Sequence, residues 1–204
     1  TLALTTVNAP PRTGYRFDGW YENAECTGSA VITVSDAKTL YAKWTAQTAN
    51  LTVVFWYENA DDKYYGQAGS VQTTANTGAT VTSDQYKDMS FTGRDGTHFT
   101  YNATKNESLI VKGDGTTVLN VYYTRNTYTL TFQGSTQKSW SESWETVATI
   151  TAKYDAKISD KFQEAPFTTT YSGRAWECTD SDKYNYALQT LDRMPGFDAT
   201  FKLY

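Results

Sequence analysis

Hydrophobic and polar residues alternate on both sides of a short polar segment near the middle of the chain. The apolar positions are Val118, Leu119, Val121, Tyr123, Tyr128, Leu130 and Phe132. A period near two, carried by β-branched and aromatic side chains, predicts two strands. The segment between them, 124–127, is polar and short. It predicts a tether between the last strand of one module and the first strand of the next.

Both halves of this pattern recur, which predicts tandem modules. Leu51–Phe55 matches Tyr128–Phe132, and the two segments start 77 residues apart, at 51 and 128. Counterparts of the closing strand lie at 36–44 and 198–204, and a further strand precedes each closing strand at 16–20, 97–101 and 174–178. The predicted modules are 1–46, 47–126 and 127–204, joined at 45–50 and 124–127. Residues 1–11 contain no strand like Leu51–Tyr57, so we expect a partial first module and a fragment of a longer protein.

The order of the predicted elements gives an α+β fold that is mostly β, with one short helix in each module. Ser83 or Asp84 can cap a helix over 83–89, and a second short helix is expected near 159–162. Residues 61–69 read as a polar loop. Gly113–Gly115 reads as the turn of a hairpin that leads into the strand at 117–123.

Aromatic content is the unusual feature of the composition: the 204 residues include 16 Tyr and six Trp. Modules of about 77 residues have thin cores, so large aromatic side chains are a way to fill them. The net charge of −4 without a basic cluster argues against nucleic acid and anionic lipid as partners. No apolar stretch reaches the roughly 20 residues that span a bilayer, so we expect no membrane insertion.

The first module resembles a known bacterial family. Gly14, Tyr15, Phe17, Gly19, Trp20 and Tyr21, then Glu25–Thr27, then Thr39–Trp44 follow the pattern of the Listeria–Bacteroides repeat, also called the internalin B-repeat. The match covers the first quarter of the chain, while the other modules share only the strand framework and the joints. The resemblance implies small β-grasp-like modules with mixed sheets, strung in tandem on cell-surface proteins of Gram-positive bacteria and linked to adhesion and virulence.

Residues suited to catalysis are few. His98, the single histidine, lies in a predicted strand without a neighbouring nucleophile, so an edge-strand role is favoured and no catalytic residue is proposed. Cys26 and Cys178 fall in different modules and are expected to be free thiols. Asp61–Asp62 and Asp180–Asp182 could hold calcium, but solvated loop acids are the favoured interpretation, and we expect no metal and no cofactor. An intramolecular isopeptide bond stays open.

Two tryptophans are the candidate ligand-binding residues. Trp140 and Trp144 lie in the polar run 135–146, where no strand pattern requires an aromatic side chain. Exposed rings would bind a sugar or an apolar patch of a partner. The favoured alternative is a hairpin in which the pair packs inward.

These observations support a non-enzymatic repeat region of an extracellular bacterial protein. We expect a monomeric, elongated rod that serves as a stalk or an adhesive module in host or surface attachment. The alternative is a module that binds a host glycan or surface protein through the aromatic residues of the third unit. The polar joints are expected to be sites of limited proteolysis, and the modules to unfold with weak coupling.

Overall fold

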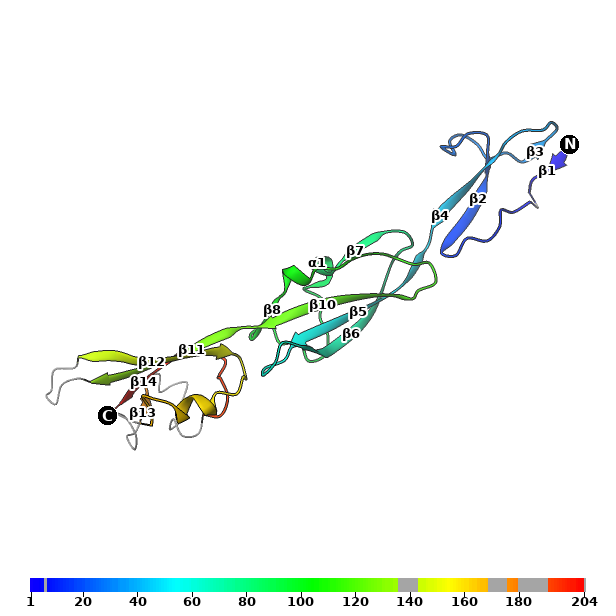
Figure 1. Cartoon of the computed structure of the whole chain (residues 1–204). Helices are drawn as coiled ribbons and strands as arrows, with labels where there is room; N and C mark the ends of the chain where they lie inside the picture. Colours follow the sequence, from blue (N-terminus) through cyan, green and yellow to red (C-terminus); the bar gives the residue numbers. More distant parts are fainter. Residues whose placement is uncertain (6, 136–142, 169–175, 180–190, 204) are drawn as a thin grey trace. The chain divides into compact units, whose positions relative to one another are not determined.

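The structure is a computed structural model that describes residues 1–5, 7–135, 143–168, 176–179 and 191–203 of the 204 (Figure 1). These residues divide into two compact units. Unit 1 consists of Thr1–Phe55, Ala68–Gly93 and Ala103–Val121, and unit 2 of Trp56–Gln67, Arg94–Asn102 and Tyr122–Tyr204. The predicted module boundary at 46/47 lies inside unit 1, and the boundary at 126/127 lies inside unit 2.

The N-terminal part of unit 1 contains two small sheets. β2 (Tyr15–Tyr21) pairs antiparallel with β4 (Tyr41–Ala46), with an irregular register between Phe17 and Gly19. β1 (Leu2–Ala3) pairs with β3 (Thr33–Val34), so a two-residue strand is present in a segment where no long strand was expected. The described residues of 1–46 form no helix, which corrects the expectation of one short helix in each module.

The next sheet has the strand order β6-β5-β10-β8, built from β5 (Thr48–Glu58), β6 (Tyr65–Asn76), β8 (Phe99–Tyr101) and β10 (Thr117–Arg125). The alternation seen in the sequence explains the unit 1 core, because every second residue is buried from Ala49 to Phe55 in β5 and from Thr117 to Val121 in β10. The buried side chains of this core are Leu51, Val53, Phe55, Val81, Val111, Leu119 and Val121.

The short helix α1 (Ser83–Tyr86) follows β7 (Thr80–Thr82). Its N-cap is Thr82, whose N–H donates to the Gln85 side chain at 2.9 Å, so the predicted caps were one or two residues late. Ser83 is fully buried instead: its hydroxyl donates to the Asn120 carbonyl at 2.7 Å and accepts the Glu107 N–H at 2.9 Å. The 3-10 turn η1 (Ala103–Lys105) and the strand β9 (Ser108–Ile110) complete unit 1.

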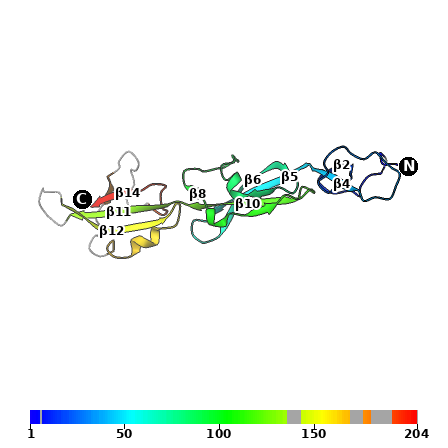
Figure 2. The ribbon, with the colours of Figure 1, turned by 90° about the horizontal axis from the view of Figure 1, so that it is seen from above.

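The four-stranded sheet of unit 2 has the order β12-β11-β14-β13, and Figure 2 shows β11 between β14 and β12. Its strands are β11 (Thr127–Ser135), β12 (Trp144–Lys153), β13 (Trp176–Cys178) and β14 (Ala199–Leu203). β11 runs parallel to β14 and antiparallel to β12, which confirms a mixed sheet. The predicted helix near 159–162 is the 3-10 helix η2 (Ser159–Gln163). The hydrophobic core of unit 2 comprises Leu130, Phe132, Ile150, Ile158, Trp176, Leu191, Met194, Ala199, Phe201 and Leu203.

Two sequence predictions in the second module were wrong. The loop expected at 61–69 ends early, because β6 begins at Tyr65. Gly66, Ala68 and Gly69, near the start of β6, have low strand propensity, but pairing with β5 stabilises the strand here. The hairpin expected around Gly113–Gly115 does not form, since β9 pairs with β7 and not with β10.

Candidate functional site at the strand joints

The predicted tethers are almost continuous β-structure. β4 ends at Ala46 and β5 begins at Thr48, while β10 ends at Arg125 and β11 begins at Thr127. A single residue, Gln47 or Asn126, therefore separates the closing strand of one module from the first strand of the next. This corrects the interpretation of 45–50 and 124–127 as polar linkers.

Gln47 is held in unit 1 by backbone hydrogen bonds on both sides. Its N–H donates to the Gly14 carbonyl at 2.8 Å, and its carbonyl accepts the Thr77 N–H at 2.9 Å. Gly14 immediately precedes β2, and Thr77 immediately follows β6. Gln47 is thus hydrogen-bonded to the residue before the first described long strand of the first module, and to the residue that ends the hairpin of the second module.

Asn126 has the same arrangement in unit 2. Its N–H donates to the His98 carbonyl at 2.8 Å, and its carbonyl accepts the Tyr154 N–H at 2.8 Å. His98 immediately precedes β8, and Tyr154 immediately follows β12. The two joints therefore repeat one geometry, which makes β2 the counterpart of β8, β4 of β10, β5 of β11 and β6 of β12.

Gly14 is required by the close approach of chains in the first joint. Its φ is +79°, and an added Cβ would lie 2.7 Å from the Thr77 Cγ2 atom and would also overlap Gly113. Both the backbone conformation and the space favour glycine here.

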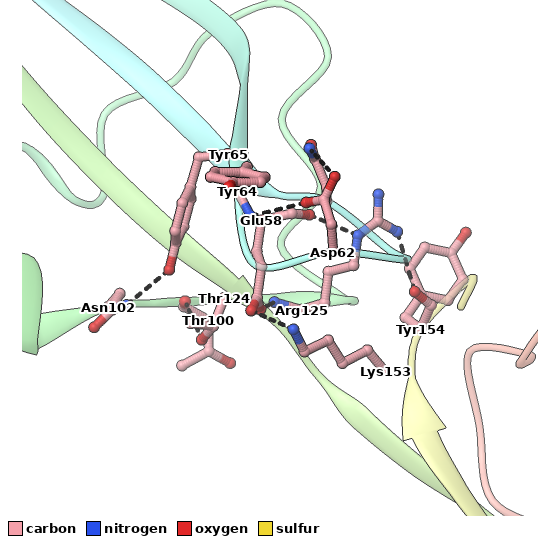
Figure 3. Close-up of polar contacts among 11 residues, drawn as sticks. Glu58, Asp62, Tyr64, Tyr65, Thr100, Asn102, Thr124, Arg125, Lys153 and Tyr154 are labelled. Atoms are coloured by element: carbon pink, nitrogen blue, oxygen red, sulfur yellow. Dashed lines mark hydrogen bonds and ion pairs between the residues drawn. The ribbon is translucent and has the colours of Figure 1, made fainter. Parts of the chain in front are cut away.

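In the second joint, side chains add a charged cluster (Figure 3). The Glu58 carboxylate accepts the Arg125 N–H at 3.0 Å and the Lys153 ammonium at 2.5 Å. Its side chain is 12% exposed, and that of Lys153 is 36% exposed. Glu58 is the last residue of β5 and Lys153 is the last residue of β12. This ion pair therefore links the first strand of the second module to the second strand of the third module.

The Arg125 side chain bridges the same two modules. Nε donates to the Glu58 carbonyl at 2.7 Å, and one terminal nitrogen donates to the Tyr154 carbonyl at 3.1 Å. Its guanidinium lies 4.9 Å from the centre of the Phe99 ring and 5.6 Å from that of Tyr154. Only 16% of this side chain is exposed, so these cation–π contacts and hydrogen bonds are largely shielded from water.

His98 packs into this joint. Its ring stacks on Tyr154 with centroids 4.1 Å apart, and Nδ1 lies 3.1 Å from the Tyr128 hydroxyl. An added Cβ at Gly196 would lie 2.7 Å from Nδ1 and would overlap the ring carbon beside it, so the glycine is what allows the ring to fit. His98 immediately precedes β8 and does not lie within it, so the strand predicted at 97–101 began two residues too early. Its neighbours give it a packing role.

Asp61 forms hydrogen bonds on the more exposed side of the joint. Its carboxylate accepts the Lys157 N–H at 2.7 Å and an Arg193 side-chain N–H at 3.0 Å. The Lys157 N–H, followed by the Arg193 hydrogen bond, lowers the pKa of Asp61 below its usual value, and Asp61 in turn raises the pKa of Arg193. Asp61 therefore stays ionised to a lower pH than an unperturbed aspartate does.

The structure places Trp144 in β12, half-buried, with the Lys202 ammonium 4.8 Å from the centre of its ring. Trp140 lies outside the described residues, as do Asp180 and Asp182. Trp140 and Trp144 as ligand-binding residues therefore stay a prediction. Cys26 and Cys178 are free thiols.

The acids weighed as calcium ligands have protein partners where they are described. Asp62 accepts hydrogen bonds from the Tyr64 N–H at 2.8 Å and from the Asn59 amide at 3.2 Å. Asp61 accepts hydrogen bonds from Lys157 and Arg193 at the joint. Within the described part of the chain, no three His, Cys, Asp or Glu side chains gather as a metal site. No helix in that part is long and apolar enough to cross a membrane.

A comparison with protein families matches residues 2–43 to the Listeria-Bacteroides repeat domain. The N-terminal segment, the one that carries β1 to β4, is therefore a repeat of this family. Repeats of this family occur in surface proteins, and the family is not a known enzyme family. A search of curated proteins found no match to the chain.

Sequence reasoning did not identify the residues that build the second joint: Glu58, Asp61, Arg125, Tyr154 and Arg193. Asp61 and Arg193, which are hydrogen-bonded to each other, are 132 positions apart in the sequence, and only the fold brings them together. One signal was available, since Arg125 is a lone cation within the short polar segment between two apolar strands.

Proposed function

We propose that the chain is a non-enzymatic repeat region of a bacterial cell-surface protein and acts as a spacer that presents other domains. The modules in this proposal are β-grasp-like and arranged as an elongated rod. The observation that carries it is the repeated joint geometry, in which a single residue separates two strands and bonds to both modules.

The physical argument concerns freedom of movement. A flexible linker of several residues would let modules reorient, whereas a one-residue connection bonded on both sides has almost no free dihedral angles. The cluster around Arg125 adds side-chain contacts that any bending at the second joint must break. A spacer built this way holds its length without needing a ligand.

Small-angle X-ray scattering of the intact chain tests the proposal. A rod gives a maximum dimension that stays constant with salt, while Arg125→Ala broadens the distance distribution. A matched control, Lys157→Ala, removes an exposed lysine 3.7 Å from Asp160 and should leave the distribution unchanged. A compact particle, or a wild-type chain as variable as Arg125→Ala, would exclude the spacer.

Adhesion remains the second proposal. A glycan and host-protein array would show binding that is lost in the Trp140→Ala, Trp144→Ala double variant. Absence of binding by the folded chain would leave the spacer role alone.

A further inference from the structure

One long sheet edge of the second module is open. β6 (Tyr65–Asn76) lies at the edge of its sheet, and among the described residues β5 is its only strand neighbour (Figure 1). No residue of β6 is buried, and Ser70, Gln72 and Thr74 are exposed. The main-chain N–H and C=O groups on the outer side of β6 are therefore available to pair with a strand of another chain.

The other edges of the two four-stranded sheets have features that oppose such pairing. β8 and β13 are each three residues long. β12 contains Glu145 and Lys153, and its register with β11 shifts between Phe132 and Gln133. Short length, charge and irregularity are the usual means by which an edge strand avoids another chain. β6 differs in length and in charge, since it has 12 residues and none of them is charged.

The absence of charge favours a second copy of this chain as the partner. When two identical strands pair antiparallel about a two-fold axis, the residue on the axis lies opposite its own copy, so a charge there would meet a like charge. An unlike partner would instead gain from charged side chains of opposite sign. Uncharged β6 meets the requirement of self-pairing and offers nothing to steer a charged partner.

The register of this pairing follows from the length of the strand. The part of β6 that belongs to unit 1, residues 68–76, pairs along its whole length when the axis passes through Gln72. Ser70 then lies opposite Thr74 of the other copy, and Val71 lies opposite Thr73. Residues that lie opposite each other share a face of the sheet, so the exposed hydroxyl and amide side chains meet one another.

We propose that β6 is a dimerisation edge: residues 68–76 of two copies of the chain pair antiparallel about a two-fold axis at Gln72 and join their sheets. Main-chain hydrogen bonds supply the attraction, and the side-chain pairs on the exposed face add to it. One strand edge is a small interface, so the dimer is weak and depends on concentration. A dimer differs from the monomer expected from the sequence, and it goes beyond the spacer role, because a chain of any shape can pair along this edge.

Sedimentation equilibrium of the intact chain tests the proposal. The weight-average mass should rise from 22.9 kDa toward that of a dimer across the micromolar to millimolar range. Gln72→Lys places two like charges opposite each other and should weaken association by at least about fivefold. Thr149→Lys is the matched control, since Thr149 is also an exposed residue of an edge strand, and it should change association by less than about twofold. Both side chains are exposed, so both variants should fold, which circular dichroism checks.

A charge-exchange experiment tests whether the two copies of residue 72 meet. Gln72→Glu alone should weaken association as Gln72→Lys does, because it also places like charges together. A mixture of the two variants should associate at least as well as the wild type, because Lys then lies opposite Glu. A mixture that associates no better than either variant alone would overturn the proposal.

Hydrogen exchange locates the contact on the chain. Amides of residues 68–76 should exchange more slowly at high protein concentration than at low concentration, while those of 144–153 in β12 should not change. A chain that stays monomeric at millimolar concentration, equal effects of Gln72→Lys and Thr149→Lys, or protection confined to another segment would each contradict pairing through β6.

Discussion

Replacing Arg125 with alanine tests whether the second joint is stabilised by its charged cluster. The change removes two hydrogen bonds, at 2.7 and 3.1 Å, and the contacts with Phe99 and Tyr154. A hydrogen bond from a charged group contributes about 1.5 kcal/mol at the low end, and a shielded cation–π contact about 0.5 to 1 kcal/mol. Glu58 keeps its Lys153 partner, so no unpaired charge is left buried. Two such hydrogen bonds and two such contacts together give a loss of about 4 kcal/mol in the free energy of unfolding.

Urea unfolding, followed by tryptophan fluorescence and far-UV circular dichroism, measures this loss. Amide exchange at Asn126 and Tyr154 reports the joint itself, because their N–H groups form its backbone bonds. Lys157→Ala should cost less than about 0.5 kcal/mol, as its ion pair is exposed. If Arg125→Ala costs no more than Lys157→Ala, and exchange at the joint is unchanged, the cluster does not stabilise the joint.

Three further changes probe other contacts. Gly196→Ala should destabilise unit 2 by about 1 to 3 kcal/mol, because the added methyl group overlaps the His98 ring; thermal unfolding should show part of this loss recovered in the Gly196→Ala, His98→Ala double variant. Ser83→Ala should cost about 1 to 3 kcal/mol in urea unfolding, since it leaves the Glu107 N–H and the Asn120 carbonyl without their buried partner, and Thr82→Ser should be nearly neutral. The lowered pKa of Asp61 means that its contribution is present above the unfolded pKa of about 3.9 and is lost as the pH falls through the folded value. The stability difference between the wild type and Asp61→Asn should therefore be constant from pH 7 to 5 and vanish at lower pH; a difference that persists at about pH 2 would assign the effect to packing.

The strands with clear alternation could be predicted from the sequence, because their period determines which side chains are buried. β5, β10, β11 and β14 all lie where the apolar pattern places them. The start of β6 could not be predicted, since Gly66, Ala68 and Gly69 have low strand propensity and the pairing with β5 is not visible in the local sequence.

The joints could not be predicted because a polar residue is found both where water solvates the chain and where other protein groups bind the side chain. Thr124 and Arg125 are polar in sequence, which is typical of a solvated linker, yet Arg125 is 16% exposed and bonded to backbone carbonyls. The partners come from Glu58 and Tyr154, which are far away in the chain. A local pattern records only that a residue is polar, and the fold decides whether water or protein satisfies it.

The joint geometry also changes the expected response to proteases and denaturant. A flexible tether would be cut first and would let modules unfold separately. In unit 2 the Asn126 N–H and carbonyl are both hydrogen-bonded, and Asn126 is the single residue between β10 and β11. Cleavage at 124–127 therefore requires the bonds to His98 and Tyr154 to open first, which exposes the ends of β8 and β12. Because those strand ends belong to successive modules, opening the joint weakens both, and we expect the sheet ends that meet there to unfold as one cooperative step.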